Sequence, residues 1–399
     1  MRVLVVFDKF KGALAAPEAC ALAGRALRAG HPDWALDLCP LTDGGDGFAG
    51  ILTRSAGGRL VPLPVAGPRG GLVDAALGLV PRARVPAPAR ELLQLPPAAA
   101  GTVAVVEMAA ASGLHRLPPE QRDPWQTSSE GTGQLIRAAA ELGAGAILLG
   151  VGGSATNDLG AGALAALGVE FRAADGGRLR PPVPALWPRI ARIEGGVFGS
   201  IPPLRVACDV ASPLLGPRGA AAVFGAQKGL RAGDLAPLEA AMARLAEMLC
   251  AHWGRPPALA EAPGAGAAGG LPFGLLVAAD ARLVPGSALV SAWLDLPARI
   301  AAADLVITGE GAFDQSSLAG KGPGAVARAA AAAGRPVHVF AGRVEAVAPP
   351  AGCTLHAITP ADLPLAAALR AAPALLARSV RAAFAPGASG STPGAFPPQ

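Results

Sequence analysis

The chain has 399 residues, with 34 basic and 29 acidic side chains, a formal net charge of +5 and no tyrosine. Its hydrophobic content of 52% is rich in alanine, and Pro, Arg or Asp interrupts every apolar stretch before the roughly 18 to 20 residues that a membrane-spanning helix needs. Because it has neither a basic block for nucleic acid nor cysteines spaced for zinc or a disulfide framework, we expect a soluble cytoplasmic enzyme with reduced thiols.

The N-terminal region has the strand, helix, strand pattern of an α/β fold. The predicted elements are a buried strand at 3–7, a helix at 17–27, a strand at 35–39 and a helix near 48–55. Charged residues Asp8, Lys9 and Lys11 follow the first strand directly, so no signal peptide is expected. A glycine-rich turn that carries Asp43 and Asp46 precedes the second helix.

The rest of the chain alternates between strands and helices. Short segments rich in Pro and Gly at 61–97 indicate strands and turns of a different domain. Asp234 is expected to cap a long helix that ends at Gly254. The other predicted elements are strands at 102–107, 146–149, 304–308 and 337–341, and helices at 133–142, 161–167 and 325–333.

This order predicts a domain interrupted by another. Residues 1–62 and 285–384 are expected to form one discontinuous parallel-sheet domain, and 63–284 an α/β domain inserted into it. The segment 385–399 has no apolar period and is expected to be a disordered tail.

The loop after the strand at 146–149 is built to hold an anion. Gly150, Gly152 and Gly153 allow backbone N–H groups to approach a ligand, since no Cβ stands in the way. The following polar side chains, together with a helix N-terminus, favour phosphate or carboxylate; they are Ser154, Thr156, Asn157 and Asp158. The alternative is an ordinary strand-to-helix turn.

Three further apolar runs end in polar loops. The first strand leads to Asp8 and Lys11, the short run at 206–208 leads to Asp209, and the strand at 304–308 leads to a loop with Gly309, Glu310, Gly311, Asp314 and Lys321. In open α/β sheets, ligands bind beyond the carboxyl ends of the strands, so these loops are expected to converge on one crevice.

Two known nucleotide motifs were tested against the sequence. A Walker A loop at Gly320 and Lys321 is rejected, because Gln315 and Gly322 stand where glycine and Ser or Thr are needed. The stretch from Gly150 to Ala155 fits G-x-G-x-x-A, with Glu170 about twenty residues on, which leaves an NAD-dependent dehydrogenase open as an alternative. The five histidines lie outside the glycine-rich polar loops and are expected to be structural.

Carboxylates beside glycine-rich loops suit phosphoryl transfer from a magnesium nucleotide. In such a reaction carboxylates hold Mg²⁺, lysines neutralise the moving phosphoryl group, and one carboxylate receives the acceptor's proton. The candidates are Asp8, Asp43, Asp46, Asp158, Asp209, Glu310 and Asp314. Asp43 and Asp46 have an alternative role as turn formers through Asx hydrogen bonds.

The chain resembles the bacterial glycerate kinase family over nearly its whole length, up to about residue 383. The motifs that carry the resemblance are DKFKGAL at 8–14, DGGDG at 43–47, EMAAASGL at 107–114, GGSATND at 152–158, ACDV at 207–210, VFGAQKG at 223–229, GAGAAGGL at 264–271 and LVITGEG at 305–311, with Asp314, Gly320 and Lys321. Ser212, Ala226 and Ser316 depart from the usual family pattern and bear on substrate preference.

The resemblance implies Mg²⁺-assisted, ATP-dependent phosphorylation of D-glycerate, at the 2-hydroxyl in this branch. It also implies two α/β domains, one Rossmann-like or flavodoxin-like and one inserted, with the site in the cleft. The expected catalytic residues are Lys11, Asp43, Asp209 and Lys321. Nucleotide binding is assigned to Gly152, Gly153, Ser154, Thr156, Asn157, Gly309, Glu310 and Gly311, and metal binding to Asp46, Asp158 and Asp314.

Several alternatives stay open at this point. Either Asp209 acts as the base, or Asp209 binds magnesium and Asp43 is the base. The reaction could be 3-phosphorylation of glycerate or phosphorylation of a related hydroxy acid, and the chain could be a nucleotide-binding module without turnover. The expected partners are D-glycerate and ATP, with neither nucleic acid nor membrane, and a homodimer is possible.

Overall fold

The computed structural model describes residues 1–95, 101–199, 201–318, 322–345 and 347–385. Contacts divide the chain into two compact units, one of Met1–Thr42 with the segment from Asp295 onward, and one of Asp43–Leu294. Apart from Ala385, the predicted tail lies outside the described residues. The α/β fold class is confirmed.

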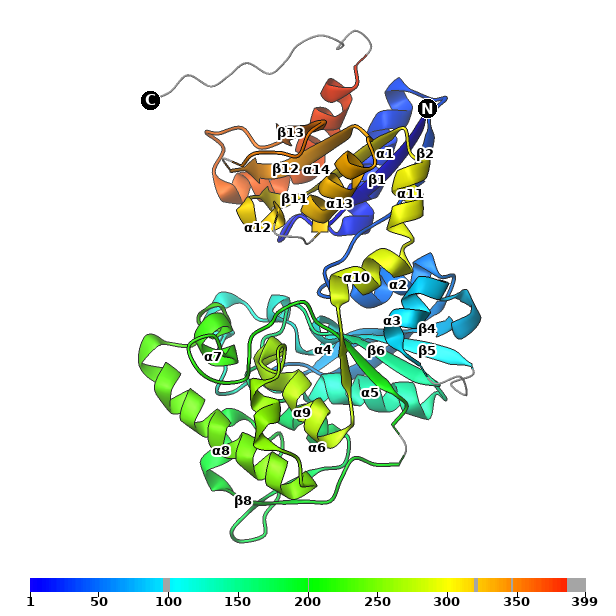
Figure 1. The fold of residues 1–399 in the computed structure, drawn as a ribbon. Helices are drawn as coiled ribbons and strands as arrows, with labels where there is room; N and C mark the ends of the chain where they lie inside the picture. Colours follow the sequence, from blue (N-terminus) through cyan, green and yellow to red (C-terminus); the bar gives the residue numbers. More distant parts are fainter. Residues whose placement is uncertain (96–100, 200, 319–321, 346, 386–399) are drawn as a thin grey trace. The chain divides into compact units, whose positions relative to one another are not determined.

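Unit 1 is built around a parallel sheet with strand order β13-β12-β11-β1-β2 (Figure 1). The strands are β1 (Arg2–Phe7), β2 (Ala35–Leu38), β11 (Leu305–Phe313), β12 (Val337–Val344) and β13 (Cys353–Ala357). The helices are α1 (Ala16–Gly30), α11 (Leu296–Ala302), α12 (Gln315–Leu318), α13 (Gly322–Ala332) and α14 (Leu365–Ala383).

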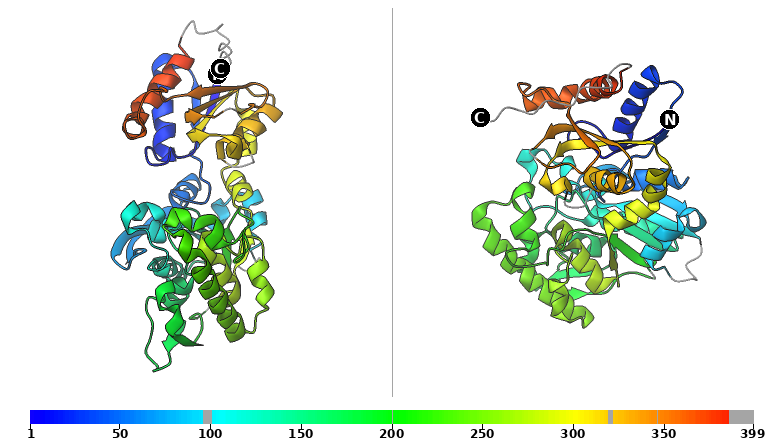
Figure 2. Two further views of the ribbon diagram at one scale, coloured as in Figure 1. Left: turned by 90° about the vertical axis from the view of Figure 1, so that its left-hand side faces the viewer. Right: turned by 45° about the horizontal axis from the view of Figure 1, so that its top comes forward.

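Helices cover both faces of this sheet, which explains why its central strands are continuously apolar. Helices α1 and α14 lie on one face and contribute to one core with Val3, Val5 and Phe7 of β1 (Figure 2). Helices α11 and α13 pack against β1 and β11 from the other side. Leu4 and Val6 of β1 are also buried, so both faces of this strand are covered.

Unit 2 contains a mixed sheet with strand order β10-β9-β6-β5-β4-β3. The strands are β3 (Arg59–Ala66), β4 (Leu72–Pro81), β5 (Thr102–Glu107), β6 (Ala146–Gly150), β9 (Leu204–Ala207) and β10 (Arg282–Val284). Neighbours from β5 to β10 pair in parallel, whereas β3, β4 and β5 pair antiparallel. The carboxyl ends of β5, β6 and β9 therefore meet at one edge of the sheet.

The helices of unit 2 form two layers. On the face of Ala104, Val106 and Leu149, α4 (Met108–Ser112) and α5 (Glu130–Glu141) contact the sheet. Helix α6 (Ala161–Ala166) packs on α5, α9 (Leu271–Ala278) on α6, and α8 (Leu235–Trp253) on α9. The other layer has α2 (Phe48–Ser55), α3 (Ala87–Leu93) and α10 (Gly286–Trp293), with α2 against β4 and β5 and α10 against β9 (Figure 1). A further short helix is α7 (Ala220–Phe224).

The boundaries between the two units lie at other residues than predicted, because of this packing. Residues 43–62 belong to unit 2, since α2 packs on its sheet and β3 pairs with β4 along its whole length. Residues 285–294 belong there too, since α10 packs on β9. The chain therefore passes from one unit to the other at 42/43 and 294/295 instead of the predicted 62/63 and 284/285.

One local prediction is wrong. Gly309, Glu310 and Gly311 were expected in a loop, but β11 continues through them to Phe313, paired in parallel with β12. Asp234 stands at the N-cap of α8 as predicted, without a side-chain capping bond. Gly254, at the other end, is left-handed with φ of 59°, as a helix-terminating glycine should be.

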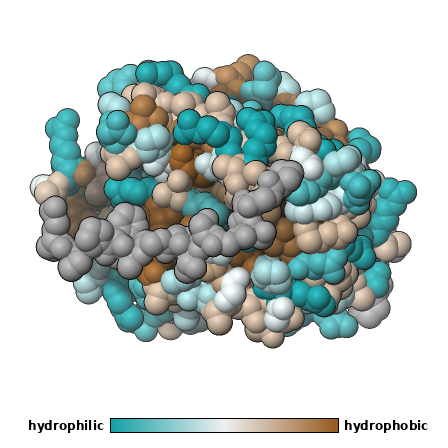
Figure 3. All heavy atoms as spheres, turned by 90° about the horizontal axis from the view of Figure 1, so that it is seen from above, coloured by the Kyte–Doolittle hydropathy of each residue, from teal (hydrophilic) through white to brown (hydrophobic). Residues whose placement is uncertain are grey.

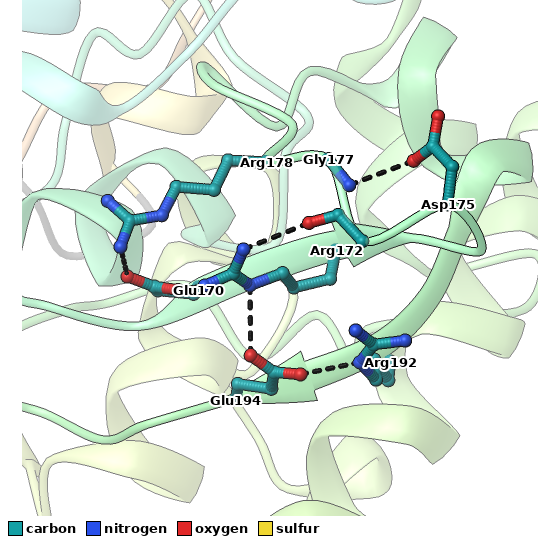
Figure 4. A network of polar contacts seen from close by, with 8 residues as sticks. Glu170, Arg172, Asp175, Gly177, Arg178, Arg192 and Glu194 are labelled. Carbon is teal, nitrogen blue, oxygen red and sulfur yellow. Dashed lines mark hydrogen bonds and ion pairs between the residues drawn. The ribbon is translucent and has the colours of Figure 1, made fainter.

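A two-stranded arm of β7 (Glu170–Ala173) and β8 (Ile190–Glu194) is held by an ion-pair network (Figure 4). Arg172 contacts Glu170 and, at 2.9 Å between Nε and Oε2, Glu194. Arg178 also contacts Glu170. Glu170 is thus engaged by two arginines in a separate arm, which argues against the ribose-binding role that a dinucleotide site would give it.

Arg178→Ala is expected to change stability little. The Arg178 side chain is 65% exposed, and exposed ion pairs contribute less than about 1 kcal/mol to the free energy of unfolding. Urea denaturation should give a small loss that shrinks further in high salt. A loss well above this range would show that the arm is a structural determinant of unit 2.

Among the described helices, none is both long enough and apolar enough to cross a membrane. The two longest, α8 and α14, have 19 residues each and carry charged side chains along their length. Outside the grey atoms, the face drawn in Figure 3 intersperses hydrophilic and hydrophobic residues.

Candidate functional site

Two glycine-rich turns interlock in unit 2. One turn is Asp43–Gly47 before α2, and the other is Gly150–Ser154 after β6. The Gly152 N–H donates to the Gly44 carbonyl at 3.0 Å. A Cβ at Gly152 would lie 2.7 Å from the backbone N and Cα of Gly45, closer than real Cβ atoms come. Only glycine at 152 therefore allows this approach.

The loop after α4 joins the same assembly. The Leu114 N–H donates to the Gly153 carbonyl at 2.8 Å, and the Ala155 N–H donates to the Ser112 carbonyl at 2.9 Å. Gly113 and Ser154 form a single antiparallel bridge. Three loops that are far apart in the sequence are thus tied together by backbone hydrogen bonds at the carboxyl edge of the sheet.

Glu107, the last residue of β5, is buried beneath the Asp43–Gly47 turn. Its Oε1 accepts the Gly47 N–H at 3.0 Å and its Oε2 accepts the Ala49 N–H at 3.1 Å. Burial raises the pKa of Glu107 to about 7, and the two N–H groups oppose this rise. A carboxyl group from β5 therefore caps helix α2.

The two carboxylates of the turn have different surroundings. Asp43 is exposed, and its Oδ1 accepts the Gly45 N–H at 3.1 Å, as the turn-forming alternative predicted. Asp46 Oδ1 lies 3.2 Å from His115 Nδ1, and the two side chains are 43% and 49% exposed. His115 thus lies beside a candidate site residue, although the sequence pattern indicated a structural histidine.

Asp158 is fully buried and surrounded by donors. Its Oδ2 accepts from the N–H and hydroxyl of Ser129, both at 2.7 Å, and from the Gly162 N–H at 3.2 Å. Its Oδ1 accepts the Gly160 N–H at 3.2 Å. In this geometry the carboxylate joins the start of α6 to the Ser129 loop through four donors, and its metal role stays a prediction.

Lys228 is buried next to Thr156, two residues before Asp158. Its Nζ donates to the Thr156 carbonyl at 2.7 Å, and burial lowers the pKa of Lys228 to about 7, opposed by the charge of Asp158. Within the described structure, the Thr156 hydroxyl and both amide atoms of Asn157 are buried without a hydrogen-bond partner. Thr156 and Asn157 were predicted to bind nucleotide, yet neither is exposed in this conformation.

Asp209 follows β9 and is held at the start of α10. Both carboxylate oxygens accept the Ser287 N–H, at 3.0 and 2.8 Å, and Oδ1 also accepts the Ser287 hydroxyl at 3.1 Å. Asp209 is partly exposed. Its carboxylate is thus anchored to the first turn of α10.

In unit 1, the predicted residues gather at the carboxyl ends of β1 and β11. Lys11 is exposed, and a Cβ at Gly311 would lie 3.3 Å from the Lys11 N, so these two segments are neighbours. A Cβ at Gly309 would lie 1.8 Å from the Phe340 carbonyl, so this glycine serves close strand packing. Asp314 Oδ1 accepts the Ser317 N–H at 3.1 Å at the start of α12. Lys321 lies outside the described residues.

The structure thus assembles Asp43, Asp46, Gly152, Gly153 and Ser154 in unit 2, and separately Lys11 and Gly311 in unit 1. Three neighbouring residues had no assigned role: Glu107, His115 and Lys228. Glu107 carried one usable signal, a charged residue ending an apolar strand. In the part of the chain that the structure describes, no three His, Cys, Asp or Glu side chains gather as a metal site.

The glycines and carboxylates of the candidate site lie in loops at the carboxyl ends of parallel strands. In α/β enzymes, ligands bind at this edge of the sheet. A model of the glycerate kinase family matches residues 3–385. A glycerate kinase of Bacillus subtilis (strain 168) is 37% identical over 388 residues, which cover 96% of each chain. A glycerate 2-kinase of Escherichia coli (strain K12) is 35% identical over 355 residues, covering 86% of this chain and 85% of its own.

A solved structure agrees with these relatives. The crystal structure of a protein assigned as glycerate kinase 2 from Salmonella typhimurium LT2 superposes with a TM-score of 0.72 at 34% identity, covering 96% of this chain and 95% of that one. The chain belongs to the glycerate kinase family. It is therefore an enzyme of the kinase class whose acceptor is an alcohol group.

Proposed function

We propose that the chain catalyses the ATP-dependent phosphorylation of D-glycerate to 2-phosphoglycerate. The observation that carries the proposal is the pair of interlocked turns, which presents Asp43 and Asp46 beside the backbone of Gly152 and Gly153. Carboxylates and backbone N–H groups together suit a phosphoryl group with its cation. The E. coli relative named as a glycerate 2-kinase supports transfer to the 2-hydroxyl.

The residues present fit a magnesium nucleotide. Mg²⁺ keeps several waters and is commonly held by only one or two carboxylates together with substrate phosphates, so a full protein cage is not required. Asp46 supplies one such carboxylate, and Asp43, on the same turn, is also accessible to solvent. When bound there, the ion would neutralise charge on the phosphate oxygens. Gly153 is exposed with φ of 71°, which leaves its backbone open to a ligand.

The remaining roles are part of the same proposal. Lys11 and Lys321 neutralise the transferring phosphoryl group, Glu310 contacts the nucleotide, and Asp314 contributes to cation binding. Asp209 orients or deprotonates the acceptor hydroxyl, supported by its anchoring to Ser287. The rival assignment makes Asp209 a Mg²⁺ ligand and Asp43 the proton acceptor. Asp209→Asn tests this choice, since an orienting carboxylate should lose kcat at every Mg²⁺ concentration, whereas a metal ligand should be rescued by more Mg²⁺.

Purified protein should convert D-glycerate and MgATP to phosphoglycerate and ADP, and excess chelator should abolish turnover. A coupled ADP assay measures the rate, and phosphorus NMR of the product identifies the hydroxyl that was used. A 3-phosphate product, or faster turnover of another hydroxy acid, would correct the substrate assignment. Turnover that persists in excess EDTA would contradict the metal role. Hydride exchange with NAD would restore the dehydrogenase alternative.

We also propose a cytoplasmic location, where ATP is available and where all five cysteines would remain free thiols as the structure has them. Burial raises the pKa of the Cys20 thiol to about 12, so this thiol is unreactive at neutral pH. A homodimer remains part of the proposal, and sedimentation analysis of the purified chain tests it.

A further inference from the structure

The helix α2 begins in an unusual way that draws on a distant carboxyl group. Gly47 stands at its N-cap with φ of 91°, a conformation that side chains rarely adopt. The usual capping residues, Ser, Thr, Asp or Asn, are therefore disfavoured at this position. The first N–H groups of α2 need an acceptor from elsewhere, and Glu107 supplies both of its oxygens from β5.

Capping α2 with the buried carboxyl group of Glu107 costs free energy that a local capping side chain would not. Glu107 is only 7% exposed, and burying a carboxylate is unfavourable even when it accepts hydrogen bonds. A different turn with a local capping residue would stabilise α2 without a buried charge. The feature that this arrangement preserves is the left-handed turn itself, which carries Asp43 and Asp46.

The first residue of α2 also sets the distance between the two turns. A Cβ at Gly150 would lie 2.6 Å from the Phe48 ring and 2.7 Å from the Gly44 carbonyl, so the start of α2 rests directly on the end of β6. Any shift of Gly47 or Ala49 away from Glu107 therefore moves the Asp43–Gly47 turn relative to Gly152. Glu107 therefore holds the Asp43–Gly47 turn and, through the start of α2, its contact with the Gly150–Ser154 turn.

We propose that Glu107 is a positioning residue for phosphoryl transfer: by accepting the Gly47 and Ala49 N–H groups it fixes the carboxylates of the Asp43–Gly47 turn against the Gly150–Ser154 turn. This inference rests on the proposed function. Glu107 does not touch the reacting groups. It acts through the backbone of the turn.

Glu107→Gln tests the proposal with little change in volume. The amide keeps one acceptor oxygen but turns an NH₂ group toward a backbone N–H, so one of the two bonds is replaced by a repulsive contact. Displacement of catalytic groups by about 1 Å can cost on the order of 100-fold in rate, so we expect a kcat loss of that order. The KM values for glycerate and ATP should change far less. Glu107→Asp, which keeps the charge but retracts it by one methylene, should give the same kcat loss.

Leu52→Ala is the matched control. Leu52 is fully buried on α2, so its truncation weakens the packing of the helix while leaving Glu107 and the residues of the turn unchanged. We expect a lower thermal midpoint with kcat near that of the parent enzyme. Circular dichroism of each variant at the assay temperature confirms that the folded form is being measured.

The measurements distinguish a failure of the proposed function from a failure of the role proposed for Glu107. A parent enzyme that does not phosphorylate glycerate overturns the proposed function, and this inference with it. An active parent whose Glu107→Gln and Glu107→Asp variants keep its kcat overturns the inference alone. The inference also fails if the kcat loss in these variants only matches that of Leu52→Ala, because Glu107 would then act solely on helix stability.

Discussion

Replacing Asp158 by alanine is expected to lower the free energy of unfolding of unit 2 by more than about 3 kcal/mol, since it leaves buried donors unpaired at about 1 to 3 kcal/mol each. The donors are the Ser129 N–H and hydroxyl and the N–H groups of Gly160 and Gly162. Asp158 is 0% exposed, so water cannot replace the lost carboxylate without local unfolding. Urea denaturation followed by far-UV circular dichroism measures the change.

Asp175→Ala is the control for this experiment. Asp175 also accepts a backbone N–H, from Gly177 at 2.8 Å, but it lies exposed in the arm, so the same truncation should have a small effect. Asp158→Asn should fall between the two variants because the amide keeps one acceptor. Parent-like stability of Asp158→Ala, combined with turnover that needs a higher Mg²⁺ concentration, would support the metal role that the sequence suggested.

The sequence predicted the elements well where local pattern decides structure. The helix at 48–55 and the strand at 102–107 have the predicted bounds, because apolar periodicity and glycine breaks are both local signals. The extension of β11 was missed for a physical reason. Gly309 resembles a loop glycine, but it is needed for close packing against the Phe340 carbonyl in the neighbouring strand. Sequence alone cannot separate these two uses of glycine.

The residues of the candidate site were predicted from sequence less completely than the helices and strands. The glycines and carboxylates of the two turns were recognised from their types and spacing. Glu107 and Lys228 were not given roles, because their contacts join positions 60 and 72 residues apart and leave no local pattern. Asp158 was given a metal role because a loop carboxylate that caps a helix and one that binds a cation look alike in sequence. Only the positions of its donors distinguish the two.

The largest effect on turnover is expected from Gly152→Ala. The new methyl group would lie 2.7 Å from the N and Cα of Gly45 and 3.0 Å from the carbonyl carbon of Gly44. These are backbone atoms, so no flexible side chain can move aside, and the two turns must separate. Because the Gly45 N–H donates to Asp43 Oδ1, a shift of Gly45 also moves the Asp43 carboxylate.

We therefore expect Gly152→Ala to fold and to lose kcat by on the order of 100-fold or more, as small displacements of catalytic groups do. Steady-state kinetics with D-glycerate and MgATP measure the loss, and circular dichroism checks the fold. Gly196→Ala is the matched control, since a Cβ there meets nothing within 4 Å and its φ is not left-handed. If Gly152→Ala turned over glycerate as fast as Gly196→Ala, the contact between the two turns would have no part in catalysis, and the site would have to be sought at the other strand ends.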